Sequence, residues 1–214
     1  MTDLADLKNR ARPTDYASME ALARAALDAG QSPDEMLRTC YGVSFPAEVH
    51  VVDAMRAADR ELPALHTNQP WSLLSLARGA PEPFKTAIGE IEQQALGIDD
   101  RLIPLMIIED DGALHGGWFV CYRRDELAAG RATIVGLVPD FWERKLHTVH
   151  RIGDSLTSVL HEHFANAVQR LGAAYDAPYN QGAGSVEEGE VDVARELLAR
   201  ADELARTVAS RQSG

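Results

Sequence analysis

The chain has 214 residues, with 21 Lys and Arg against 33 Asp and Glu, so its formal net charge is -12 at pH 7. This acidic balance, with a sequence pI near 5.0, argues against a nucleic-acid partner and against adsorption to anionic lipid, because both require clustered Lys and Arg. Hydrophobic residues make up 45% of the chain and form no run of about 18 apolar residues, so we expect no membrane association.

Only two cysteines occur, Cys40 and Cys121, and both lie in apolar surroundings. They form neither a disulfide framework nor a CxxC metal motif, so we expect buried thiols in a reducing compartment and no cofactor. The acidic start, residues 1–6, lacks the apolar stretch of a signal peptide. These features predict a cytoplasmic protein.

The N-terminal two thirds of the chain begin with mainly helical patterns and continue with mainly strand patterns, an order that favours an α+β fold over alternating βαβ units. Residues 1–14 are predicted to be a flexible N-terminal arm that ends at the Pro13–Thr14 step. Apolar residues at helical spacing, caps and prolines predict helices over 16–29, 33–40, 46–58 and 84–96. Apolar and branched runs predict strands over 71–76, 102–108, 118–122 and 133–138, with a turn at 110–112 and a loop at 125–130.

The C-terminal third is predicted to be helical. A strong amphipathic helix covers 151–171, and a last helix covers 186–209, with Val193, Leu197, Leu204 and Val208 on one stripe. That stripe either mediates dimerisation or docks on the protein's own sheet. The predicted organisation is therefore an arm over 1–14, a single α+β domain over 15–172, a linker over 173–185 and a C-terminal helix over 186–214. Its sheet is a mostly antiparallel meander packed with N-terminal and C-terminal helices.

Several of these segments together resemble the SMI1/KNR4 (SUKH) superfamily. Segment 41–49 (YGVSFPAEV) is similar to the part of that family where a short helix is followed by a proline at the start of the next helix. The resemblance continues through an apolar strand, an acidic glycine turn, two further strands and a closing helix, at 102–105, 110–112, 118–122, 133–138 and 151–171. It covers about residues 30–172, and the pair Gly116-Gly117 has no counterpart in the pattern.

This resemblance implies an interaction module rather than an enzyme. Many bacterial members of the superfamily resemble immunity proteins that bind and neutralise a toxin domain, and its fungal relatives are regulatory. The family supplies no catalytic residues. The hypothesis it favours is a protein-binding module, in the immunity case one with a basic toxin domain as its partner.

Two alternatives remain open. Four histidines lie close together at 147, 150, 161 and 163, and a small metal-dependent hydrolase would use His147, His150 and Asp154. If they shared one helix, His150 and His161 would lie about 16 Å apart along its axis, too far for one ion. The second alternative is a homo-oligomeric adaptor, for instance a homodimer, assembled through residues 186–214.

The excess charge is not spread evenly along the chain. Residues 61–140 hold 6 basic and 12 acidic side chains, and residues 173–214 hold 4 and 8. We therefore expect a basic partner to be steered by Asp99, Asp100, Asp110 and Asp111. The same residues could be read as solvated turns.

Overall fold

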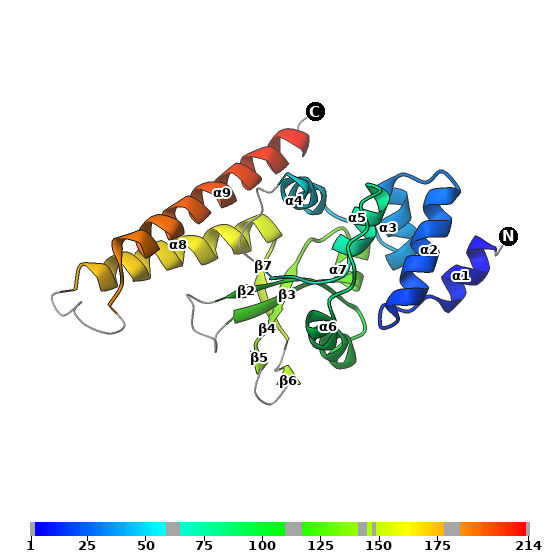
Figure 1. Ribbon diagram of the computed structural model, residues 1–214, viewed down its shortest axis with the longest axis horizontal. Helices are drawn as coiled ribbons and strands as arrows, with labels where there is room; N and C mark the ends of the chain where they lie inside the picture. The colour runs from blue at the N-terminus through cyan, green and yellow to red at the C-terminus, as the bar shows by residue number, and fades with distance from the viewer. Residues whose placement is uncertain are drawn as a thin grey trace.

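The computed structural model describes residues 3–58, 65–109, 117–140, 145–146, 149–177 and 185–212. Over these residues the protein has an α+β fold, in which an antiparallel sheet carries helices on both faces (Figure 1), as the sequence predicts. Its helices are α1 (Leu4–Arg10), α2 (Tyr16–Asp28), α3 (Pro33–Tyr41), α4 (Ala47–Ala57), α5 (Trp71–Ala77), α6 (Thr86–Ile98), α7 (Arg124–Ala128), α8 (Leu156–Tyr175) and α9 (Glu188–Gln212). Its strands are β1 (Leu65–His66), β2 (Leu102–Glu109), β3 (Gly117–Arg123), β4 (Ile134–Leu137), β5 (Pro139–Asp140), β6 (Lys145–Leu146) and β7 (His150–Gly153).

The main sheet has the strand order β1-β2-β3-β4-β7, and each neighbouring pair is antiparallel. Strands β2, β3 and β4 form the predicted meander. Strands β5 and β6 form a separate two-stranded ladder between β4 and β7. A shift of register between Pro104 and Met106 interrupts the β2–β3 pairing.

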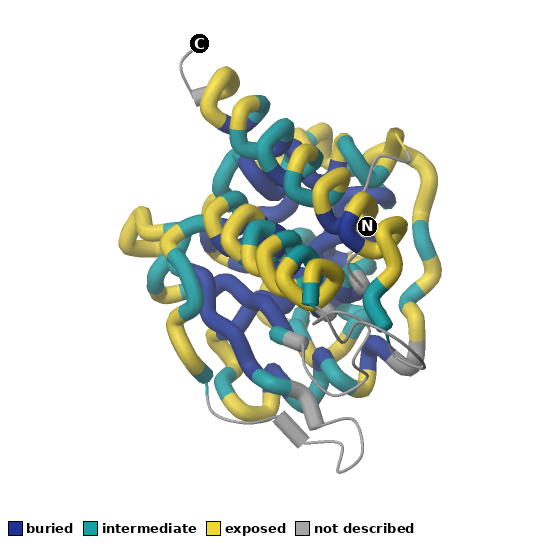
Figure 2. The backbone as a smooth tube through the Cα atoms, turned by 90° about the vertical axis from the view of Figure 1, so that its left-hand side faces the viewer, coloured by how far each residue is buried: buried dark blue, intermediate teal, exposed yellow. Residues whose placement is uncertain are grey.

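The two faces of the sheet bury different clusters of side chains. On β3, Val120 and Tyr122 join the main core with the helices before the sheet and after it, whereas Phe119 and Cys121 join a smaller cluster under α6. This alternation follows from the two-residue period of a strand. Figure 2 shows the sheet and the inner faces of the helices as buried and the outer helix faces as exposed.

Helices α2, α3 and α4 begin within one residue of where the sequence predicts. Asp15 caps α2 by accepting a hydrogen bond from the Ser18 N–H. Ser32 and Glu35 form a reciprocal capping box at the start of α3, with Pro33 in its first turn. Helix α4 starts after Pro46, and the predicted helix at 84–96 is α6.

Two expectations about local structure are wrong. Residues 71–76, predicted as a strand, belong to helix α5, and residues 125–130, predicted as a loop, include helix α7. Both faces of α5 are buried, so Trp71, Leu73 and Leu74 are all inside. A short apolar run of this kind has no period that separates a buried helix from a buried strand.

The helix predicted over 151–171 starts later and ends later. Strand β7 occupies His150–Gly153 and pairs with β4, and α8 begins at Leu156 after its cap Ser155, whose side chain accepts the Ser158 N–H. Ile152 packs against the main core from β7, so its apolar side chain suits a strand as well as a helix face. Helix α8 continues to Tyr175, three residues into the segment predicted as a linker.

Both ends of the chain are more closely integrated than predicted. The N-terminal arm contains helix α1, and Leu4 and Ala11 pack against the main core. Helix α9 lies along α8 and contacts α4. Its apolar stripe is therefore docked within the protein, as one of the two expectations had it, but mainly on helices α8 and α4 rather than on the sheet. The stripe is formed by Val191, Ala194, Ala201, Leu204 and Val208, whereas Val193 faces outward and is 55% exposed.

Candidate functional site

Two of the four predicted partner-binding aspartates lie in the turn between α6 and β2. Asp99 accepts hydrogen bonds from the Nε and Nη2 of Arg101, at 2.8 and 2.9 Å, and from the Arg101 backbone N–H at 3.0 Å. The Arg101 guanidinium accordingly lowers the pKa of the Asp99 carboxyl. Asp100 is exposed. Asp110 and Asp111 lie outside the described residues.

This corner of the molecule is electrically balanced. We define the corner as three aspartates and three arginines, Asp99, Asp100, Asp125, Arg101, Arg123 and Arg124. Arg123 and Arg101 both reach Asp125, with N–O distances of 2.7 and 3.4 Å. Arg123 also lowers the pKa of Asp125. Paired charges of this kind cancel at a distance, so Asp99 and Asp100 give the corner little long-range attraction for a basic partner.

A groove of about 490 Å³ continues from the corner between α7, β4 and β7. Three arginines and two carboxylates line it. Arg131 pairs with Glu126 and Arg151 with Asp154, and the third arginine, Arg123, pairs with Asp125 of the corner. The groove is therefore balanced in the same way as the corner. It presents no excess of either charge to a partner.

The candidate hydrolase residues are not brought together within the described chain. His150 lies in β7, with its ring edge-on to Trp118 at 6.5 Å between centroids, and Asp154 pairs with Arg151. His147 lies outside the described residues. His161 Nδ1 instead meets Asp202 Oδ1 at 2.8 Å, which links α8 to α9. In the part of the chain that the structure describes, no three His, Cys, Asp or Glu side chains gather as a metal site would need.

Two buried carboxylates have a structural role. Glu48 of α4 accepts the backbone N–H groups of Leu156 and Thr157, at 2.9 and 3.1 Å, and the Tyr122 hydroxyl. It therefore satisfies the first turn of α8, where backbone donors have no partner within the helix. Glu92 of α6 does the same ahead of α5, accepting the N–H groups of Asn68 and Gln69 at 3.0 Å and the Tyr16 hydroxyl at 2.7 Å. Burial raises the pKa of Glu92.

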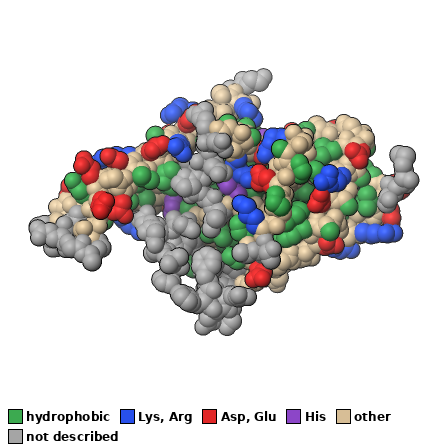
Figure 3. Space-filling view, viewed as in Figure 1, with side chains coloured by type: hydrophobic (Ala, Val, Ile, Leu, Met, Phe, Trp, Pro, Cys, Tyr) green, Lys and Arg blue, Asp and Glu red, His purple; other side chains and the backbone are tan. Residues whose placement is uncertain are grey.

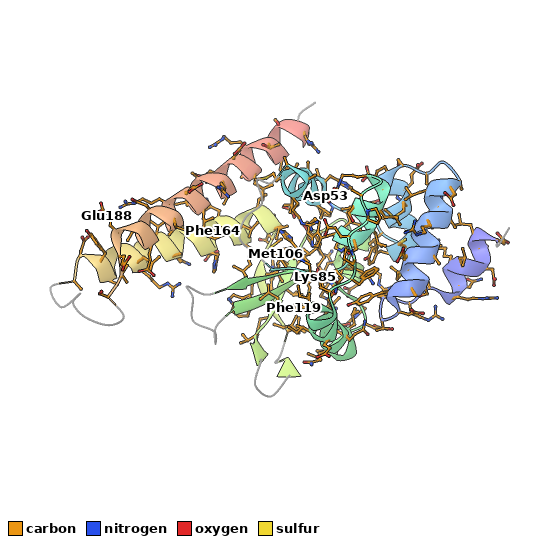
Figure 4. The ribbon with its side chains drawn as sticks, viewed as in Figure 1. Asp53, Lys85, Met106, Phe119, Phe164 and Glu188 are labelled. Carbon is orange, nitrogen blue, oxygen red and sulfur yellow. The ribbon has the colours of Figure 1, made fainter. Side chains whose placement is uncertain are left out.

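Helices α8 and α9 form an arm that extends beyond the sheet (Figure 1). Close to the sheet, Phe164 and Ala201 still belong to the main core. Further out, the buried side chains between the helices, Ala167, Val191 and Ala194, belong to neither core cluster. Figure 4 shows Phe164 partway along this arm and Glu188 at its outer end.

The outer end of the arm carries an uncompensated negative charge. We define the arm tip as the described residues 170–177 and 185–196, which include six carboxylates and two arginines. Asp192 pairs with Arg195 and Glu196 with Arg200. Four other carboxylates have no ion pair within the residues the structure describes: Asp176, Glu187, Glu188 and Glu190. Figure 3 shows acidic side chains gathered at this end of the molecule.

Two large apolar side chains are exposed among these carboxylates. Tyr175 is 42% exposed at the end of α8, and Val193 is 55% exposed on α9. Sequence patterns assign the acidic residues of α9 to its solvent side but place Val193 on the buried stripe. The error has a visible signal, because Val193 lies two residues after Val191, and both cannot face the same side of a helix.

No protein-family model, curated protein or solved structure matches this chain. The resemblance to the SMI1/KNR4 superfamily therefore stays a prediction from the residues quoted above. No helix in the described ranges is long and apolar enough to cross a membrane.

Proposed function

We propose that the protein is a protein-binding module whose arm tip binds a basic surface of its partner. One observation carries the proposal: four carboxylates without an ion pair among the described residues share the tip of a projecting arm with exposed Tyr175 and Val193. Apolar anchors within a charged rim are the usual composition of a protein–protein interface. The acidic rim selects a partner of opposite charge.

The placement of one of these charges, that of Asp176, costs the isolated protein stability. Acidic residues in the first turn of α9, Glu188 and Glu190, suit the positive end of that helix dipole. Asp176, however, is the C-cap of α8, and the last turn of α8 contains no basic residue. A carboxylate at the negative end of a helix dipole is unfavourable, and a cationic partner would offset that cost. A carboxylate at this end of α8 is therefore better suited to a complex with a cationic partner than to the free protein.

The resemblance to SUKH immunity proteins fits such a partner, namely a basic toxin domain that the arm tip neutralises by binding. The adaptor alternative loses its motivating feature, since the apolar stripe of α9 packs on α8 and α4. The hydrolase alternative gains no observation from the described residues.

The experiment measures association with the basic protein encoded beside this chain's gene. Neutralising the tip in Glu187→Gln, Glu188→Gln and Glu190→Gln should slow association about tenfold at low salt and flatten its salt dependence. The matched control neutralises the corner in Asp99→Asn, Asp100→Asn and Asp125→Asn, and should change the rate less than about twofold.

Equal effects of the two triple variants would overturn the assignment to the arm tip. The immunity version fails if the neighbouring genes encode no toxin-like protein or if that protein does not bind. Circular dichroism and a thermal melt of each variant establish that it is folded before its rate is compared.

A further inference from the structure

A separate pocket lies among the N-terminal helices. Those helices are on the side of the molecule away from the arm formed by α8 and α9 (Figure 1). It has a volume of about 440 Å³ and is enclosed by the α1–α2 connection, the end of α3, the end of α6 and the start of α7. Its volume is within the range of small-molecule sites, about 300–1,000 Å³.

The pocket is cationic although the chain is acidic. Three basic side chains line it, Lys8, Arg12 and Arg124, against one carboxylate, that of the exposed Asp100. None of the three makes an ion pair within the described residues, whereas Arg101 and Arg123, the other two arginines of the corner, and the arginines of the neighbouring groove do. Their charge is therefore available to a ligand.

Two of these cations are held in place by backbone oxygens. Arg12 Nη1 donates to the carbonyls of Asn9 and Ala11, at 2.9 and 2.8 Å, and Arg124 Nη2 donates to the carbonyl of Asp100. A carbonyl fixes a guanidinium without neutralising it. Because a guanidinium has five N–H donors, each arginine keeps several for an anion.

The remaining walls are apolar or neutral. Tyr41 and Leu96 are 3% and 6% exposed and line the pocket together with Pro13. The Tyr41 hydroxyl is already bound, donating to Gln69 Oε1 at 2.8 Å. Cys40 also lines the pocket, and burial raises the pKa of its thiol to about 12, so this wall carries no charge at neutral pH. The Thr14 hydroxyl at the rim is a neutral donor.

We propose that this pocket binds a small phosphorylated ligand, with the phosphoryl group on Arg12, Arg124 and Lys8 and an apolar or aromatic moiety against Tyr41 and Leu96. Paired guanidiniums match the geometry of phosphate oxygens, and a doubly charged anion gains most from three cations. The proposal is independent of the arm tip and of the protein-binding function.

The test titrates the full-length protein with phenyl phosphate and with inorganic phosphate at constant ionic strength, by calorimetry. Saturable binding is expected, with phenyl phosphate at least about tenfold tighter than inorganic phosphate because only the former reaches the apolar walls. The double variant Arg12→Gln and Arg124→Gln should weaken phenyl phosphate binding more than about tenfold. The control, Arg24→Gln, removes an exposed arginine that pairs with Glu20 on α2 and should leave binding unchanged.

Three results would overturn the proposal. The first is the absence of saturation with either probe up to about 10 mM. The second is a loss of phenyl phosphate affinity in Arg24→Gln as large as that in the double variant. The third is a double variant that binds phenyl phosphate as tightly as the wild type. A thermal melt of the double variant guards against misfolding. If that variant is unfolded, the substitution Arg124→Lys is used instead, because it keeps the positive charge but removes the planar guanidinium. It should bind phenyl phosphate more weakly than the wild type does. Unchanged binding would contradict the guanidinium contact.

Discussion

The arm tip and the corner at the α6–β2 turn are both rich in acidic residues in the sequence, yet they differ in the folded protein. At the corner, Arg101 in the α6–β2 turn and Arg123 at the end of β3 pair with Asp99 and Asp125 and cancel their charge. At the arm tip, four carboxylates have no ion pair among the described residues. The difference shows that the local density of acidic residues does not locate an electrostatic binding surface. What matters is which cations the fold brings alongside.

The two regions are also attached to the body differently. The arm begins at a buried charged contact, since Glu48, which is 3% exposed, holds the first backbone N–H groups of α8. The corner is held by ion pairs at the surface, where Arg101 is half exposed. Removing a residue from each region should therefore have very different costs.

The largest effect is expected for Glu48→Ala. The change leaves two N–H groups at the buried start of α8 and the Tyr122 hydroxyl without their acceptor, so we expect a loss of about 3 kcal/mol or more in the free energy of unfolding. Urea denaturation monitored by circular dichroism measures it. Glu48→Gln, which keeps one acceptor oxygen, should lose less. A loss below about 1 kcal/mol in Glu48→Ala would show that α8 does not depend on this anchor.

The next largest effect is a difference in stability loss between substitutions on the buried side and on the exposed side of α9. Leu204 is fully buried in the main core, so Leu204→Ala should cost about 2–5 kcal/mol of stability, through lost burial and the cavity that remains. Val193 faces solvent, so Val193→Ala should change stability by less than about 0.5 kcal/mol. Thermal unfolding measures both.

The affinity for the partner should respond to these two substitutions in the opposite order, with the larger effect from Val193→Ala. Val193→Ala is expected to weaken the complex, because Val193 is a proposed apolar anchor of the arm tip. If Val193→Ala instead destabilises the protein as strongly as Leu204→Ala, Val193 is part of the core and the tip loses one of its two anchors.

Much of the fold can be predicted from the sequence, because local signals and tertiary packing agree there. The capping box of Ser32 and Glu35, the Pro46 start and the alternating β3 residues each specify one structure. Prediction fails where an apolar run is buried on all sides, as in α5. It also fails where an apolar residue fits the pattern of a strand and that of a helix equally well, as Ile152 does. A cap at Ser155 after Gly153 is the signal that places the start of α8 correctly.

The candidate site is predicted less well, for a physical reason. The partners of Asp99 and Asp125 include arginines up to 24 residues away, which only the pairing of β2 with β3 brings close. The three cations of the N-terminal pocket likewise come from α1, from the α1–α2 connection and from α7. No sequence window contains these neighbourhoods. A count of charges along the chain therefore overstates the net negative charge of the corner and gives no sign of the three cations that meet in the pocket.

The smallest effect concerns the pH dependence of the corner. The pKa of Asp99 is lowered from its ordinary value of 3.8 in the folded protein, chiefly by its hydrogen bonds with Arg101. The pair thus stabilises the fold above that ordinary pKa, and its contribution is lost as pH falls through the lower, folded value. Because Arg101 is exposed to solvent, we expect less than about 1 kcal/mol.

Asp99→Asn should accordingly reduce stability slightly at pH 7, and its difference from the wild type should shrink as pH falls below the ordinary pKa of the Asp99 carboxyl and that group takes up a proton. Urea midpoints measured across this pH range give the difference, and added salt should shrink it, since surface pairs are screened. A larger loss that persists in high salt would mean that Asp99 is held in a less solvated setting than the corner provides. The charge at the corner would then be fixed by burial as well as by arginine pairing, which would weaken its contrast with the arm tip.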